Sequence, residues 1–218
     1  MNSTVPRLRP RTRVVALLLI ALGPAGVAEA QGRSHCRSPQ PPSVGVAFGR
    51  SSPYFDLASG VVEPSGTGSV QVRAGAQFGA RAELPVAGPL RLRIDAATAR
   101  WDVRQTTYDP DEFTVTANTS VGQMSARHLV ALIGVRTGRA PACAHVSAGG
   151  GVYALGFRSA SVRRPGASLA AGIDLPTGAH GAIQVDAMLH LIATRDGHPI
   201  ASSTALALNL LVGWAYRF

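Results

Sequence analysis

The sequence predicts an all-β fold, an eight-stranded antiparallel up-and-down transmembrane β-barrel. Three observations lead to this prediction. In the last thirteen residues, apolar side chains at every even position alternate with mostly small or polar ones. The N-terminus carries a basic and then apolar leader, and the connections between the predicted strands alternate between short and long.

The terminal segment, Leu206 to Phe218, is apolar at every even position and ends with the aromatics Trp214, Tyr216 and Phe218. Period-two alternation places the even and odd sets on opposite faces of a strand. In a soluble protein, an apolar strand at a free terminus would invite aggregation. A strand that crosses a bilayer has lipid on one face and the lumen on the other, with aromatics at the interface. We therefore predict that the even positions face lipid.

The N-terminal leader has the order of a secretory signal peptide. Four arginines (Arg7, Arg9, Arg11 and Arg13) precede the apolar run 14–22, and Ala28-Glu29-Ala30 follows. The apolar run is about half of the roughly 20 residues that a membrane-spanning helix needs. We expect residues 1–30 to be removed, residues 31–42 to form a periplasmic N-terminal segment, and residues 43–218 to form the barrel.

The composition narrows the classes of partner. The chain has 21 basic and 12 acidic residues and a formal net charge of +9. Such a balance can indicate nucleic-acid binding. An exported chain does not normally meet nucleic acid, and the arginines are spread along the chain, so we expect no nucleic-acid partner. Anionic lipid headgroups are the expected counter-charge.

Eight segments have strand character, and the second is the clearest because every even position from Val70 to Leu84 is apolar. An amphipathic helix does not produce this pattern. In the third segment, the alternation places Leu92 and Ile94 outward. The eight predicted strands are 43–50, 69–84, 90–101, 127–136, 143–157, 167–175, 183–193 and 206–218.

The connections alternate in length along the chain. Those at 85–89, 137–142 and 176–181 are tight, and those at about 51–67, 103–125, 158–166 and 194–203 are longer and more polar. Barrels of the outer membrane have short periplasmic turns and longer external loops. Eight antiparallel crossings that start in the periplasm place all three tight turns and both termini there.

Taken with this topology, the closing aromatics Trp214, Tyr216 and Phe218 resemble the assembly signal of bacterial outer-membrane β-barrels. The whole of 43–218 resembles the small eight-stranded barrels of the OmpA/OmpX-like superfamily. The resemblance implies a location in the bacterial outer membrane and recognition by the barrel-assembly machinery. The chain lacks the periplasmic peptidoglycan-binding domain that some of these proteins add, so the resemblance does not extend to a cell-wall tether.

A soluble eight-stranded barrel of the lipocalin type is the alternative fold, with its apolar face inward. The terminal aromatic strand, the absence of an early Gly-x-Trp signature near the first strand, and the loop asymmetry count against it. A soluble β-sandwich is less favoured still.

In the favoured fold, ten charged side chains face the lumen, with His128 and His190 beside them. An eight-stranded barrel is just wide enough for side chains to fill, so these charges must be paired or hydrated. They form either a structural polar core, which we favour, or a narrow gated ion path. The tight turn centred on Ala87 predicts that Glu83 lies opposite Arg91 and that Arg81 lies diagonal to Asp95. The predicted lumen charges are Arg73, Arg81, Glu83, Arg91, Arg93, Asp95, Arg136, Asp174, Asp186 and Arg217.

Catalytic and metal-binding patterns are weak. His145 and Ser147 share one strand face, as the catalytic pair of a lipid A-modifying outer-membrane enzyme could. No surrounding deacylase pattern accompanies them, and we interpret both as ordinary lumen residues. The acidic loop residues Asp109, Asp111 and Glu112 could hold calcium, but a solvated loop is the simpler interpretation. We therefore expect neither a metal nor a cofactor.

Arginines gather near the predicted external loop ends. Arginine suits phosphate, so we expect Arg158, Arg163 and Arg164 to contact outer-membrane lipid headgroups, including lipopolysaccharide. A merely solubilising rim is the alternative. The other rim residues are Arg50, Arg100, Arg104, Arg127 and Arg195.

The two cysteines, Cys36 and Cys143, are both predicted at the periplasmic end. That compartment is oxidising, and we expect a disulfide between them. Two free thiols are the alternative.

The predicted function is a non-enzymatic outer-membrane barrel with a surface-interaction or envelope-integrity role. A lipid A-modifying enzyme and a narrow pore are the alternatives.

Overall fold

The computed structural model describes Cys36, residues 41–55, Leu57 and residues 68–108, 115–139, 142–177, 179–193 and 204–218. The predicted signal peptide, most of the predicted periplasmic segment, Arg195 and the acidic residues Asp109, Asp111 and Glu112 lie outside these ranges. No helix in the described ranges is long and apolar enough to cross a membrane.

The described chain is all-β. Its strands are β1 (Ser43–Tyr54), β2 (Gly68–Arg73), β3 (Gly75–Ala87), β4 (Leu90–Tyr108), β5 (Val115–Arg139), β6 (Ala142–Phe157), β7 (Ala160–Pro176), β8 (Gly181–Ile192) and β9 (Ala205–Arg217).

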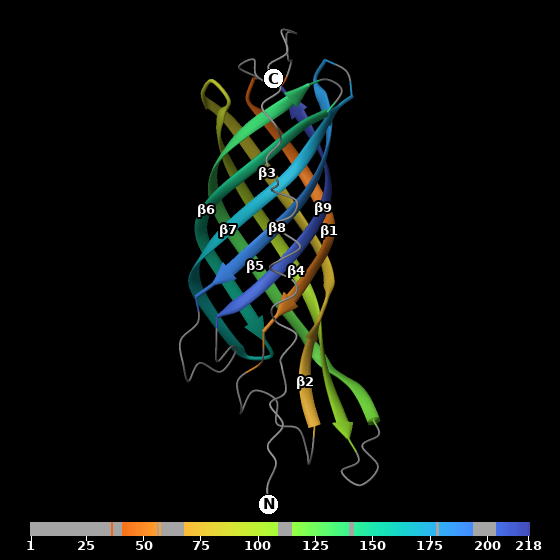
Figure 1. Cartoon of the computed structure of the whole chain (residues 1–218). Coiled ribbons are helices and arrows are strands. Elements are labelled where there is room, and N and C mark those ends of the chain that lie inside the picture. Colours follow the sequence, from red (N-terminus) through yellow and green to blue (C-terminus); the bar gives the residue numbers. More distant parts are fainter. Residues whose placement is uncertain are drawn as a thin grey trace, which may run out of the picture. The chain divides into compact units, whose positions relative to one another are not determined.

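Eight of these strands close into an antiparallel ring, which confirms the predicted up-and-down barrel (Figure 1). Each of these strands pairs with its ring neighbours, and β1 closes the ring by pairing with both β3 and β9. β2 pairs with β4 and continues the line of β3. We call the end with the C-terminus and the Gly88 turn the turn end, and the opposite end the loop end.

The second predicted strand is interrupted, which corrects the prediction for Arg73. Ala74 lies outside both β2 and β3, and the register against β4 shifts by one residue there, from Arg73 opposite Asp102 to Gln77 opposite Ala99. A one-residue shift exchanges the two faces of a strand. Arg73 is therefore exposed, whereas Val72 packs against the buried apolar cluster.

Two predicted loops are largely strand, and this also corrects the prediction. β4 runs to Tyr108 and β5 begins at Val115, so the region 103–125 is mostly a long hairpin. With β2 it forms a sheet that extends past the rest of the barrel at the loop end (Figure 1). The region 158–166 belongs mainly to β7, which begins at Ala160 directly after the turn residues Arg158 and Ser159.

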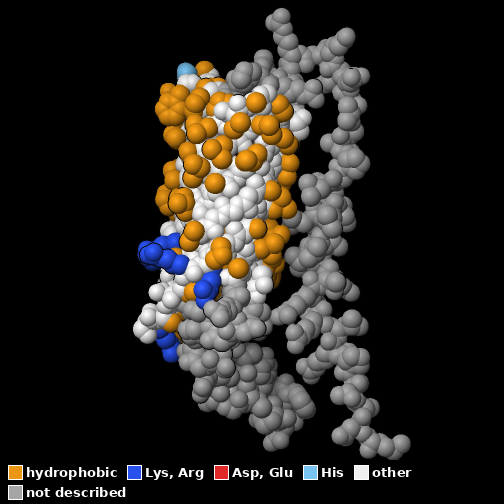
Figure 2. All heavy atoms as spheres, turned by 90° about the vertical axis from the view of Figure 1, so that its left-hand side faces the viewer, with side chains coloured by type: hydrophobic (Ala, Val, Ile, Leu, Met, Phe, Trp, Pro, Cys, Tyr) orange, Lys and Arg blue, Asp and Glu red, His pale blue; other side chains and the backbone are white. Residues whose placement is uncertain are grey.

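Large apolar side chains point outward, which confirms the predicted lipid-facing alternation and contradicts the lipocalin alternative. They form a belt around the turn-end part of the face in Figure 2. Trp214, Tyr216 and Phe218 are 48%, 39% and 66% exposed. Their rings contact one another in sequence, at 6.2 Å and 5.5 Å between centroids. Other outward apolar residues include Val46, Phe48, Phe78, Leu129, Ile133, Val152 and Leu210.

The terminal aromatics generate the first prediction. Replacing Trp214, Tyr216 and Phe218 together with Ser should leave export intact and block insertion, because the outward aromatic edge of the closing strand is lost. The measurement is the heat-dependent mobility shift of the protein in outer-membrane fractions. Replacing Trp214 and Tyr216 with Phe keeps the aromatic faces and should insert normally. Normal outer-membrane levels of the triple Ser variant would contradict the prediction.

Candidate functional site

The turn-end half of the lumen contains a ring of alternating charges. Arg81 contacts Asp95 at 2.8 Å and Asp186 at 2.6 Å. Arg93 contacts the same two carboxylates, at 2.5 Å and 3.0 Å. All four side chains are at most 8% exposed. Because each arginine faces two aspartates and each aspartate two arginines, the ring neutralises itself without water.

A second group of charges lies nearer the turn end. Arg136 contacts Glu83 at 2.9 Å and also pairs with Asp174. His145 joins the two groups, since its Nε2 is 2.7 Å from Asp186 and its Nδ1 is 3.8 Å from Asp174. We call these contacts together the ionic layer, which consists of Arg81, Glu83, Arg93, Asp95, Arg136, His145, Asp174 and Asp186.

Nine of the ten predicted lumen charges are buried or half-buried. Arg217 is half-buried on the inward face of β9, and Arg73 is the exception described above. The buried members are Arg81, Glu83, Arg91, Arg93, Asp95, Arg136, Asp174 and Asp186.

The predicted pairing within the first tight hairpin is wrong by two residues. Arg81 lies directly opposite Asp95, and Glu83 lies opposite Arg93 rather than Arg91. The β3–β4 turn is shorter than expected, because only Gly88 and Pro89 lie outside the strands. An even shift changes the partners but keeps each side chain on the same face.

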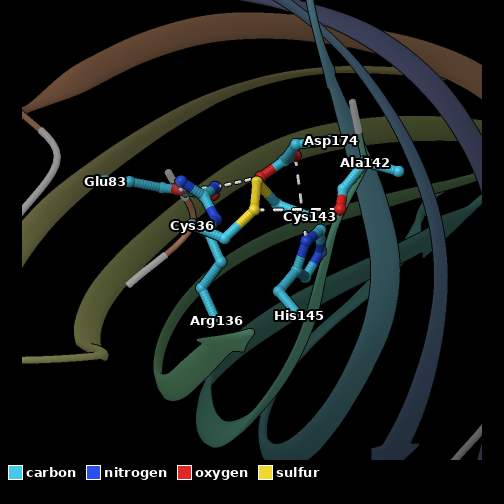
Figure 3. Close-up of a disulfide and its surroundings, with 7 residues drawn as sticks. All are labelled: Cys36, Glu83, Arg136, Ala142, Cys143, His145 and Asp174. Atoms are coloured by element: carbon cyan, nitrogen blue, oxygen red, sulfur yellow. Dashed lines mark hydrogen bonds and ion pairs between the residues drawn. A yellow bond between two sulfur atoms is a disulfide. The ribbon is translucent and has the colours of Figure 1, made fainter. Parts of the chain in front are cut away.

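The disulfide between Cys36 and Cys143 is confirmed, with Cα atoms 5.6 Å apart. Both cysteines are 2% exposed. Figure 3 shows the bridge beside Arg136, Glu83, Asp174 and His145. It therefore links the N-terminal segment to β6 next to the ionic layer.

Toward the loop end the lumen becomes neutral and polar. Tyr153 Oη lies 2.5 Å from Ser168 Oγ and 2.8 Å from His190 Nδ1. Ser168 Oγ is also 2.8 Å from His190 Nδ1, and the His128 ring lies 4.6 Å from the His190 ring. We call this group the polar layer, which consists of Gln77, His128, Tyr153, Ser168, His190 and Asn209.

Beyond the polar layer, apolar side chains fill the loop-end half. The ring of Trp101 lies 5.7 Å from that of Phe55, and its Nε1 donates a hydrogen bond to Ser51 Oγ at 3.0 Å. The members of this apolar layer, all 9% exposed or less, are Phe55, Trp101, Val103, Met124, Leu155 and Phe157.

The three layers leave little free space among the described lumen residues. Three cavities between these side chains measure about 10 to 20 Å³ each, and a larger one of about 350 Å³ lies at the turn end beside Pro89, Val135, Arg136 and Thr137. Each of the three small cavities holds at most about one water molecule. The arrangement thus favours a structural polar core over the ion-path alternative.

His145 and Ser147 do not form a nucleophile–base pair. His145 is bonded to Asp186, a partner that the sequence reasoning missed because it lies on β8. Ser147 Oγ is buried and has no hydrogen-bond partner among the described residues. A serine nucleophile requires a base within hydrogen-bond reach, and the described contacts of Ser147 include none.

The outward face carries a second charged feature. Arg50, Arg100, Arg127 and Arg163 are exposed on β1, β4, β5 and β7, and we call them the basic belt. Figure 2 shows basic side chains on the loop-end side of the apolar belt. Arg127 and Arg163 both pair in register with Ala154 of β6, so a small residue separates them.

The remaining rim arginines have other roles. Arg164 is half-buried and pairs in register with the inward Tyr153, which corrects its predicted lipid-facing position. Arg158 lies in the β6–β7 turn with its guanidinium 5.3 Å from the Phe157 ring centre. Arg104 and Ser120 hydrogen-bond Asp102 on the loop-end extension and hold the pKa of that carboxyl below its usual range.

Solved structures share this fold. Neisserial surface protein A (NspA) aligns with a TM-score of 0.54 and 10% identity, over 81% of this chain and 97% of that chain. Ail, the attachment invasion locus protein of Yersinia pestis, aligns with a TM-score of 0.45 and 11% identity, over 82% and 99%. The N-terminal β-barrel domain of Pseudomonas aeruginosa OprF gives 0.45 and 12%, over 82% and 98%. No family model and no curated protein matches the sequence.

The likeness to NspA shows the fold, an eight-stranded barrel of the kind found in bacterial outer membranes. The outward apolar belt agrees with it, since a face of this kind requires lipid. The protein has the barrel fold of these bacterial outer-membrane proteins.

The charge ring generates the second prediction. Asp186→Asn should lower the free energy of unfolding by about 3–5 kcal/mol, because Arg81 and Arg93 then share one carboxylate in a buried site. The measurement is urea unfolding in phospholipid bilayers. Asp102→Asn, whose carboxylate is 31% exposed in its pair with Arg104, should lower the free energy of unfolding far less, because solvent screens that pair. Equal effects of the two variants would contradict the buried network.

The disulfide generates the third prediction. The bridge joins residues 107 apart in the sequence, and a loop of about 100 residues contributes about 4.7 kcal/mol in the chain-entropy model. Replacing Cys36 and Cys143 with Ser should lower the free energy of unfolding by up to about that amount while the barrel still inserts. Thiol titration of wild-type protein isolated without reductant should detect no thiol, and two titratable thiols would disprove the bridge.

Proposed function

We propose that this protein is a non-enzymatic outer-membrane barrel that supports envelope integrity by binding the phosphate groups of outer-leaflet lipid, with lipopolysaccharide as the ligand. The observation that carries the proposal is the basic belt: four exposed arginines on four strands, next to the exposed apolar side chains of the barrel.

The cost of placing an arginine on the lipid-facing surface depends on its depth in the bilayer, and this supports a contact with headgroups. An arginine on the lipid face costs about 2–4 kcal/mol at the bilayer midplane and about 0–1 kcal/mol near the interface. Outward arginines are therefore tolerated where the hydrocarbon ends. Guanidinium groups bind phosphate through paired hydrogen bonds, and a lysine could not reproduce this geometry.

The spacing of the belt also suits anionic groups. Arg127 and Arg163 lie two strands apart, about 10 Å at the usual strand spacing, with Ala154 between them. Long arginine side chains can converge over the small alanine, and a phosphate placed there would reduce their mutual repulsion. Arg50 of β1 lies directly opposite Ala76 of β3. An arginine beside an alanine on the neighbouring strand therefore occurs here as well.

Because side chains fill the lumen, a ligand-binding role on the outside of the barrel is favoured. The ionic, polar and apolar layers occupy the interior, so a lipid or macromolecular ligand would contact the protein on its lipid-facing surface or its loop-end extension.

A surface-interaction role is the second candidate, and the loop-end extension is the observation that favours it. The sheet of β2 with the outer parts of β4 and β5 extends beyond the ring of eight strands (Figure 1). A soluble or cell-surface partner could contact this sheet without entering the bilayer.

The basic belt generates the fourth prediction. Replacing Arg100, Arg127 and Arg163 with Ser should reduce the lipopolysaccharide that co-purifies with the folded barrel at least fivefold, because three phosphate-binding groups are lost. Lipopolysaccharide is quantified per mole of heat-modifiable protein.

A control variant with the same change in net charge separates belt binding from general charge. Replacing Arg73, Arg104 and Arg158 removes three arginines outside the belt and should leave the co-purified lipid unchanged. Unchanged lipid in the belt variant, or equal loss in both variants, would overturn the proposal.

A further inference from the structure

The polar layer contains a small cavity lined by side chains with buried polar atoms that have no hydrogen-bond partner among the described residues. The cavity measures about 10 Å³ and is lined by Gln77, His128, His190, Asn209 and Trp101 among others. Four buried atoms of these side chains have no hydrogen-bond partner among the described residues: Gln77 Oε1, His128 Nε2, His190 Nε2 and Asn209 Oδ1. Buried polar atoms are normally satisfied, so a group of four around one cavity calls for a ligand.

From this cavity we infer a binding site for one divalent transition-metal ion, held by His128 Nε2 and His190 Nε2, with the amide oxygens of Gln77 and Asn209 completing it. Imidazole nitrogen suits zinc, copper and nickel ions. A cavity with room for one atom excludes an organic ligand.

The distance between the two ring centres is compatible with binding of one ion by both imidazoles. At a metal–nitrogen distance of about 2.0–2.1 Å, two imidazoles on one ion have their centres about 4.5–5 Å apart. The observed distance between the His128 and His190 ring centres is 4.6 Å.

The contacts behind His190 prepare its free nitrogen for a metal. A histidine that binds a metal usually donates its other N–H to an oxygen, which fixes the tautomer. His190 Nδ1 lies 2.8 Å from both Tyr153 Oη and Ser168 Oγ. When Nδ1 donates to these hydroxyls, the lone pair of Nε2 is available in the cavity. His190 is 1% exposed, so water does not compete from bulk.

The neighbouring charges tolerate a cation. Asp95 and His128 line an adjoining cavity of about 10 Å³. Arg81, which also lines it, is already paired with both Asp95 and Asp186. Because its charge is balanced by these carboxylates, Arg81 should repel a cation in the neighbouring site only weakly.

Trp101 provides the readout. The chain has two tryptophans, so Trp214→Phe leaves Trp101, which lines the cavity, as the sole emitter. The Trp214→Phe protein, without a histidine tag, is refolded in detergent micelles at a series of Cu²⁺ concentrations. The ion is present during refolding because the packed layers leave it no path into the folded barrel. Copper should quench Trp101 emission saturably at one equivalent, and Zn²⁺ should restore the emission by competition.

Variants in the same background assign the site. His128→Asn should weaken the quenching at least tenfold, and His190→Asn should do the same. His180→Asn removes an exposed histidine at the turn end, stacked on Tyr216, and should leave the quenching unchanged. His190 also contacts Tyr153 and Ser168, so its replacement could prevent folding. The heat-dependent gel shift reports folding, and if the His190→Asn protein does not show it, the result for His128→Asn decides. Quenching that does not saturate, that survives in His128→Asn, or that is absent from the parent protein would overturn the site.

Discussion

The narrowness of an eight-stranded ring is the constraint on which the rest of this structure depends. The interior of such a barrel is just wide enough for side chains, so a charged residue that faces inward is removed from bulk water. One unpaired charge there would cost several kcal/mol. Arg81 and Arg93 each contact both Asp95 and Asp186. Every charge of this group therefore has two partners of opposite sign, and none is left unpaired. Where the ionic layer ends, the lumen is filled by neutral polar groups and then by apolar ones. Along β4 the inward residues follow this order, from Arg93 and Asp95 to Trp101 and Val103.

The fold was predictable because the two faces of each membrane strand meet different solvents. Where a strand crosses the apolar belt, its outward residues are mostly apolar and its inward residues mostly small or polar, as in Leu206–Phe218, although Leu211 is an inward apolar exception. The same signal disappears outside the bilayer, where both faces of a strand can be polar. The outer parts of β4 and β5 and the start of β7 therefore looked like loops. Ala74 shows another limit. Its one-residue irregularity reverses the facing of Arg73, although the apolar alternation in the sequence runs through it without interruption.

The candidate sites were predictable in part. The sequence of one strand predicts which side chains point inward, but it does not predict which residues of other strands they contact. Inward positions for Arg81 and Asp186 follow from their own strands, but their contact joins residues 105 apart in the sequence and exists only after the ring closes. The carboxylate beside His145 was missed for the same reason. The correct partner of Glu83 depended on the length of one turn. Arg163 and Arg164 are adjacent in sequence, and once β7 is recognised as a strand they must point to opposite faces.

A lumen filled by its own side chains leaves the outer surface and the buried layers as the places where a ligand could bind. The disulfide with Cys143 holds Cys36 beside Arg136 and His145 of the ionic layer. Trp101 and Phe55 cover the polar layer from the loop end. Groups inside the barrel are thus isolated from bulk solvent on both sides. In that isolation, a set of polar atoms without partners among the described residues, such as His128 Nε2 and His190 Nε2, is costly unless something binds it, whereas arginines of the basic belt can bind anions from the membrane at any time. The filled interior therefore separates the proposed internal site, which an ion would have to enter during folding, from the proposed external site on the lipid-facing surface.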